Sequence, residues 1–146
     1  MAFTMANRGL YTLLTAATSG STDIRALVFK TTTPTVAAIR DMNFVSDLLG
    51  ATTEAAAAGY ARLDLASVAL VESDASDNVV LSAAAPTTAA IAAGETWLGI
   101  GYYVEGASDA ARTLIGVDVP AASQVTNGGP ITLPALSGRV LLGQAG

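Results

Sequence analysis

Apolar and small or polar side chains alternate most regularly over residues 95–105, which hold the only tryptophan and two of the four tyrosines. An extended chain would place one face on Leu98, Ile100, Tyr102 and Val104, and the other on Trp97, Gly99, Gly101 and Tyr103. A period of two with aromatic and β-branched residues is typical of a β-strand. Because both faces are apolar, we predict a central strand, with its glycines where a ring or another backbone approaches closely.

Other segments with a similar pattern predict an antiparallel β domain. We expect further strands at residues 23–30, 60–71, 79–83, 112–119, 131–133 and 139–142. The period shifts near Ser67, which predicts a bulge or a bend. Residues 72–78 are expected to connect two strands of a hairpin, and residues 127–130 are expected to form a turn. These strand spacings are typical of a sandwich or barrel.

One short helix is predicted between the first two strands. Thr33 and Pro34 suit a helix start, apolar residues recur at helical spacing as far as Leu49, and Gly50 would end the helix. The pattern also permits a break near Asn43. The predicted fold class is therefore mainly all-β: an antiparallel β-sandwich or barrel-like domain with one short inserted helix and an N-terminal arm.

The domain organisation follows from where the strong strand patterns begin. Residues 1–22 are predicted to be an N-terminal arm with one short ordered piece, and residues 23–146 a single β domain. The arm either docks on a neighbouring subunit or forms a first edge strand. We therefore place its apolar residues among the candidate contact residues, which are Leu10, Tyr11, Leu13 and Leu14.

Charged residues are scarce, at 13% of the 146 residues, whereas apolar residues reach 51% and aromatics only 5%. A free monomer normally stays soluble through mixed surface charges, so this composition favours a surface that is covered by other proteins. The alternative is a soluble monomer of biased composition. The net charge of −5 argues against nucleic-acid binding, and no apolar run reaches the roughly 18 residues of a membrane span. The N-terminus also lacks the pattern of a signal peptide.

The chain contains neither histidine nor cysteine, which excludes Ser-His-Asp and Cys-His catalysis and the usual zinc and haem sites. It has no glycine-rich phosphate-binding loop. Asp74 and Asp77 do not have EF-hand spacing, so a solvated turn is favoured over a calcium site. For Asp47, hydrogen bonding to backbone amides is favoured over catalysis. We predict no enzymatic activity, no catalytic residue, no cofactor and no metal site.

Two charged residues in the 60–71 strand complete the candidate contacts. Arg62 and Asp64 are two residues apart and share a strand face. They could pair across strands or with a neighbouring subunit, where a buried ion pair would specify register or partner. A plain surface location is the alternative.

Three segments in this order carry a family resemblance: DMNFVSD at 41–47, GYARLDL at 59–65 and NGGPITL at 127–133. With the hairpin at 74–79 and the strand at 97–104, they resemble small β-rich structural proteins of tailed bacteriophages, the head decoration or minor virion proteins. The similarity covers roughly residues 23–142. The chain departs from the pattern at two places. At residues 83–86 the family has an acidic and an aromatic residue, whereas this chain has Ala-Ala-Ala-Pro. At position 136 an aromatic is common in the family, whereas this chain has leucine.

The resemblance implies a virion structural protein. Within that class we predict a head decoration (cement) protein on the capsid exterior. Its partners would be the major capsid protein and further copies of itself, with a trimer preferred to a dimer. The alternative is a carbohydrate- or receptor-binding module of a tail or fibre that uses exposed faces of Trp97, Tyr102 or Tyr103, although core packing is favoured for these aromatics.

Overall fold

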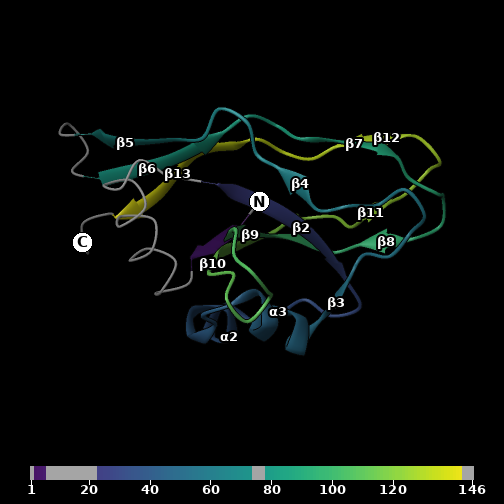
Figure 1. The fold of residues 1–146 in the computed structure, drawn as a ribbon, viewed down its shortest axis with the longest axis horizontal. Coiled ribbons are helices and arrows are strands. Elements are labelled where there is room, and N and C mark those ends of the chain that lie inside the picture. The colour runs from purple at the N-terminus through teal and green to yellow at the C-terminus, as the bar shows by residue number, and fades with distance from the viewer. Residues whose placement is uncertain (1, 6–22, 74–77, 143–146) are drawn as a thin grey trace.

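The computed structural model describes residues 2–5, 23–73 and 78–142, and the chain there is mainly antiparallel β with two short helices (Figure 1). This confirms the predicted fold class. The elements form three layers, with the helices on one face of a central sheet and a second group of strands on the other.

The central sheet has the strand order β1-β10-β9-β2-β3, with β4 also paired to β2. Its strands are β1 (Ala2–Met5), β10 (Leu114–Val119), β9 (Gly99–Val104), β2 (Ile24–Lys30), β3 (Thr53–Glu54) and β4 (Leu63–Asp64). The aromatic strand β9 therefore lies at the centre, as its two apolar faces predicted. Strand β1, from the range assigned to the arm, pairs with β10, whereas Leu10, Tyr11, Leu13 and Leu14 lie outside the described residues.

The second layer consists of one three-stranded sheet, in the order β13-β6-β5, and of two strand pairs, β12-β7 and β11-β8. It contains β5 (Ala69–Ser73), β6 (Asn78–Ala83), β13 (Leu136–Leu142), β7 (Thr87–Ala90), β12 (Pro130–Thr132), β8 (Thr96–Trp97) and β11 (Gln124–Val125). Strands β6, β7 and β8 pair in turn with β13, β12 and β11, so residues 78–97 run antiparallel to residues 124–142. The pattern did not predict β7 and β11, because Ala, Thr, Ser and Gln give little hydrophobic periodicity.

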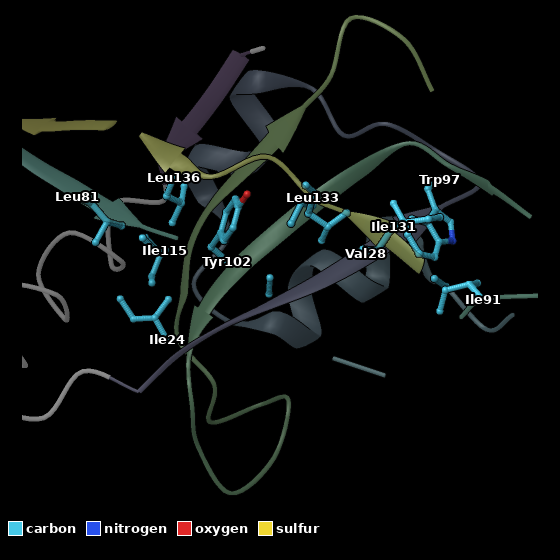
Figure 2. Packing of buried hydrophobic residues seen from close by; sticks show 14 residues of the cluster. Ile24, Val28, Leu81, Ile91, Trp97, Tyr102, Ile115, Ile131, Leu133 and Leu136 are labelled. Carbon is cyan, nitrogen blue, oxygen red and sulfur yellow. The ribbon is translucent and has the colours of Figure 1, made fainter. Parts of the chain in front are cut away.

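Two apolar clusters hold the three layers together, and alternate residues of β2 enter opposite clusters. Ile24 and Val28 face the second layer, where they pack with the apolar side chains of Leu81, Tyr102, Ile131, Leu133 and Leu136 (Figure 2). Leu27 and Phe29 face the helices, where they pack with Tyr103, Ile39, Val45 and Leu48. Full burial of such a side chain contributes about 1.5–3 kcal/mol, so both faces of the sheet are needed for stability.

The two glycines of β9 lie where neighbouring atoms leave no room for a side chain. A Cβ at Gly99 would lie 2.4 Å from Phe29 Cζ and 2.8 Å from the carbonyl oxygen of Asp118. A Cβ at Gly101 would lie 2.6 Å from Leu48 Cδ2. The predicted close approach of a ring or a backbone is therefore confirmed at Gly99, whereas the close neighbour at Gly101 is an aliphatic side chain.

The predicted strand 95–105 is interrupted at Leu98, between β8 and β9. Trp97 consequently packs in the same cluster as Ile100 and Tyr102, while Leu98 packs on the helix side with Tyr103. The predicted faces of Trp97 and Leu98 were wrong, because a strict period of two does not continue through the interruption.

The inserted helical segment is split into α2 (Val36–Asp41) and α3 (Val45–Ala51), with the break near Asn43 that the pattern permitted. The predicted ends were wrong. Thr35, not Thr33, caps α2 by accepting a hydrogen bond from Ala38 N, and α3 continues past Gly50. Asp47 Oδ2 accepts from the backbone amides of residues 43 and 44, which confirms its predicted backbone-bonding role.

The predicted strand at 60–71 is also divided, into β4 and the start of β5. Ser67 lies between them with a φ of 55°, a left-handed conformation that bends the chain. The predicted change of phase at this residue is confirmed.

Candidate interaction surface

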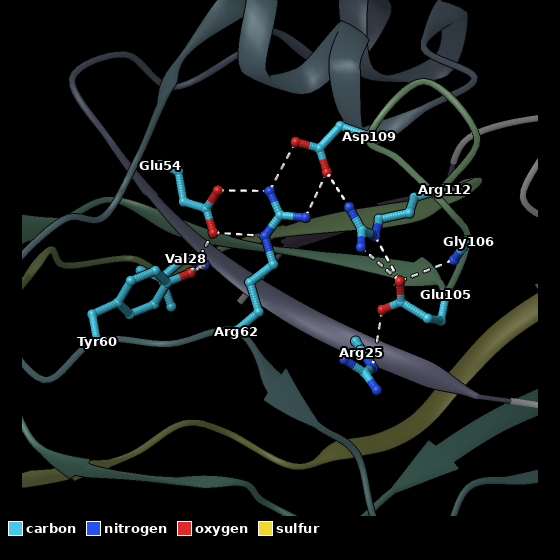
Figure 3. Close-up of polar contacts among 9 residues, drawn as sticks. All are labelled: Arg25, Val28, Glu54, Tyr60, Arg62, Glu105, Gly106, Asp109 and Arg112. Carbon is cyan, nitrogen blue, oxygen red and sulfur yellow. Dashed lines mark hydrogen bonds and ion pairs between the residues drawn. The ribbon is translucent and has the colours of Figure 1, made fainter.

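Eight of the 19 charged residues, from 7 basic and 12 acidic in the chain, belong to one connected ion-pair network. Its members come from five separate segments and are Asp23, Arg25, Glu54, Arg62, Asp64, Glu105, Asp109 and Arg112. Figure 3 shows all of them except Asp23 and Asp64. In a chain with so few charges, this is a strong concentration of charge at one place.

Arg62 joins the two halves of the network. Its Nε and Nη2 each donate to Glu54 at 2.7 Å, and its Nη1 donates to Asp109 Oδ1 at 2.6 Å. The guanidinium carbon also lies 5.5 Å from the ring centroid of buried Tyr103, which allows a cation–π contact. The hydrogen bonds from Arg62 hold the pKa of Asp109 below its usual value, so this carboxyl stays ionised.

Arg112 and Arg25 extend the network at the C-terminal end of β9, where Glu105 follows the strand. Arg112 donates to Glu105 Oε1 at 2.8 Å and to Asp109 Oδ1 at 2.9 Å. Arg25 Nε lies 3.0 Å from Glu105 Oε2 and 2.8 Å from Asp64 Oδ1. Each of the three arginines therefore contacts at least two carboxylates, which leaves them poorly suited to capture an external anion.

The network stabilises the helix-facing side of the sheet next to the start of α3. Tyr60 accepts a hydrogen bond from Val28 N at 2.9 Å and donates to Glu54 at 3.1 Å, which ties the segment before β4 to β2. The carbonyls of Asp109 and Arg112 each accept a backbone hydrogen bond from the first turn of α3. We interpret the network as an internal brace and not as a ligand site.

Arg62 and Asp64 thus both belong to the network, but they do not pair with each other. Arg62 pairs with Glu54 and Asp109, and Asp64 pairs with Arg25, its register partner across β2 and β4. Sequence spacing could not identify these partners, since Asp109 is 47 residues from Arg62.

A second polar cluster surrounds Glu95, next to β8. Its carboxylate accepts hydrogen bonds from Trp97 Nε1 at 2.9 Å and from the backbone amides of Ala56 and Ala57, and it pairs with Lys30. Burial would raise the pKa of Glu95, but these hydrogen bonds outweigh it and hold the pKa at about 2. Glu95 therefore stays ionised near neutral pH, and its hydrogen bonds link the loop after β3 to β8.

The second layer contains a surface of the opposite character. Residues 83–94 and 119–136 include no Asp, Glu, Lys or Arg, and we call them the uncharged surface. The β7–β12 and β8–β11 pairs bring these two separate segments together. Val125, with 53% of its area exposed, is the most exposed large apolar residue of the described chain. Ile91, Ile131 and Leu133 of the uncharged surface pack in the cluster on one face of the central sheet, whereas Arg62 and Arg112 of the network contact Tyr103 in the helix-side cluster.

A partly open cavity of about 180 Å³ borders the uncharged surface. Its lining includes Trp97, Ile100, Pro120, Ile131 and Leu133 and contains no titratable side chain. It offers apolar contact but no group able to transfer a proton or attack a substrate.

The three aromatic residues of the alternative sugar-binding hypothesis are all buried. Trp97, Tyr102 and Tyr103 expose 2%, 1% and 0% of their areas, and they belong to the two apolar clusters. Burial counts against a stacking platform made from these residues, because a sugar ring needs an exposed aromatic face.

Within the described ranges, no group of three or more acidic residues is arranged to hold a metal ion, and Asp74 and Asp77 lie outside those ranges. Neither described helix has the length and apolar character needed to cross a bilayer. Comparisons of the chain with protein-family models, curated proteins and solved structures gave no match.

Proposed function

We propose that this protein is a structural protein of a bacteriophage virion, a head decoration (cement) protein that binds the capsid exterior through its uncharged surface. The observation that carries the proposal is the uneven distribution of charge: eight charged residues gather in one network that contacts Tyr103 of the helix-side cluster, whereas two paired segments of the second layer carry no formal charge. The assignment to a bacteriophage virion comes from the family resemblance over residues 23–142.

The physical reason is the cost of removing charges from water. Burying an ion without a matched partner costs several kcal/mol, whereas Ala, Thr, Pro and Val surface can be covered without that penalty. The uncharged surface can therefore meet another protein at low desolvation cost. The chain's net charge of −5 then resides on surfaces that stay in contact with solvent.

Repetition on the shell would compensate for weak individual contacts. Linked copies, here as a trimer in preference to a dimer, bind with an avidity that exceeds each single affinity. A protein that binds only the mature shell stabilises it by RT ln(1 + [L]/Kd), about 2.7 kcal/mol at a hundredfold excess over Kd. The partners are thus the major capsid protein and further copies of this chain. Docking of the arm through residues 10–14 stays part of the proposal.

The test uses particles of the phage that encodes this chain, purified on a density gradient. Quantitative mass spectrometry should find this chain and the major capsid protein in about equal numbers. A few copies per particle would place the chain in the tail or a fibre and overturn the decoration role. Absence from the particle would overturn the virion assignment altogether.

A matched pair of variants tests the uncharged surface. Val125 on β11 and Val36 on α2 expose nearly equal fractions, 53% and 51%, on opposite layers of the fold. Val125→Asp should lower occupancy on particles at least about tenfold, equivalent to about 1.4 kcal/mol, because it buries an unpaired carboxylate. Val36→Asp should bind as the wild type does. Equal effects of the two substitutions would remove the uncharged surface from the proposal.

A further inference from the structure

The turn between β11 and β12 contains an Asn-Gly pair in an open setting. Asn127 is exposed, and Gly128 has a φ of 91° with no atom within 4 Å of the position of an added Cβ. Among the described residues, no acceptor binds the Gly128 N–H. The Gly128 nitrogen therefore donates to no acceptor in the described chain, and its residue carries no side chain that would cover it.

The Asn127 amide is also held in a defined place. Gly129 N donates to Asn127 Oδ1 at 3.0 Å. A donor on this oxygen polarises the amide carbonyl and would stabilise the negative charge that develops there when Cγ is attacked. The turn thus supplies a free nucleophile on one side of the amide and an oxyanion donor on the other.

We propose that Asn127 is a site of self-modification, at which the side-chain amide is lost by attack of the Gly128 nitrogen. A bond forms between Gly128 N and Asn127 Cγ, the Gly128 amide proton passes through water to Nδ2, and the Cγ–Nδ2 bond breaks with release of ammonia. Water then opens either carbonyl of the resulting five-membered succinimide. One water is consumed, and the product is aspartate or isoaspartate, about 1 Da heavier than asparagine.

Asn43 provides an internal reference. It is also exposed, but the next residue is Phe44, whose backbone N–H donates to Asp47 Oδ2 at 2.9 Å. Its side-chain amide contacts the carbonyl oxygen of Asp41. The nucleophile at this position is engaged and sterically covered, so amide loss at Asn43 should be much slower.

The modification would place a carboxylate within the uncharged surface. The net charge would change from −5 to about −6. If the uncharged surface binds the shell, modified copies would bind less tightly. This consequence rests on the proposed function, whereas the chemistry at Asn127 does not.

The test incubates the purified full-length chain in mildly alkaline buffer and follows each asparagine by peptide mass spectrometry. Asn127 should gain about 1 Da, as separable aspartate and isoaspartate products, at least about tenfold faster than Asn43, a barrier difference of about 1.4 kcal/mol. Asn127→Gln should abolish the signal, because attack would need a less favoured six-membered ring. Equal rates at Asn127 and Asn43, or an aspartate product without isoaspartate, would overturn the proposal.

Particle binding separates the two proposals. Asn127→Asp should lower occupancy on particles, whereas Asn127→Gln should not. If the unmodified wild type does not bind particles, the proposed function is wrong. The mass measurement would still show whether Asn127 loses its side-chain amide. If Asn127→Asp binds as the wild type does, the consequence for docking is refuted.

Discussion

Replacing Arg62 with methionine tests whether the ion-pair network braces the fold. Methionine retains an unbranched apolar stem but removes the bidentate hydrogen bonds to Glu54 and Asp109 and the contact with the Tyr103 ring. Two neighbouring carboxylates would be left without their shared cation. We expect a clear loss of stability with no change of fold.

The magnitude follows from the burial of the three side chains. Breaking a fully buried ion pair by removing one partner costs about 3–5 kcal/mol. Arg62, Glu54 and Asp109 keep 19%, 22% and 35% of their side-chain areas exposed, so water recovers part of this loss. We expect about 2–3 kcal/mol, which for a domain of this size lowers Tm by about 5–10 °C.

Urea unfolding of Arg62→Met measures the loss of unfolding free energy, and thermal melts measure the change in Tm. Arg40→Met is the matched control, because Arg40 is exposed in the last turn of α2 and should cost no more than about 1 kcal/mol. Glu54→Gln should cost less in the Arg62→Met background than in the wild type, since the two residues share an interaction. The stabilising role of the network would be refuted if Arg62→Met cost no more unfolding free energy than Arg40→Met. It would also be refuted if the costs of Glu54→Gln and Arg62→Met were additive in the double variant.

Two further predictions concern packing and pH. Gly99→Ala should destabilise the fold by about 1–3 kcal/mol, because the added Cβ meets Phe29 and Asp118. Gly50→Ala should stabilise the fold by about 0.5–1 kcal/mol, because α3 has open space at this position. If urea unfolding shows that both substitutions change the unfolding free energy in the same direction, this reasoning is wrong. Glu95 has a folded pKa of about 2, below the ordinary 4.5, so its stabilisation is complete above pH 4.5 and is lost toward pH 2. The difference in unfolding free energy between wild type and Glu95→Gln should therefore shrink over this range, and a constant difference would contradict the assignment.

Local sequence patterns were sufficient to predict the most regular strands of this protein without any tertiary information. Alternation predicted the strands β2 and β9, and for β9 also its two apolar faces, because successive side chains on a strand point to opposite sides. The shift at Ser67 and the break near Asn43 also appeared in the sequence, since each interrupts a periodic run. Exact helix ends were not predictable, because Thr33 and Thr35 are both good caps and only the folded backbone selects one.

The composition of the chain determined that charge is scarce and that histidine and cysteine chemistry is excluded. Where the charges gather was decided by the fold. Arg62 meets Asp109, and residues 83–94 meet residues 119–136, only because the strands pair over long separations. Sequence periodicity reports which face of its own strand a side chain occupies, but it carries no information about which distant strand lies beside it. That choice depends on the packing of the whole chain.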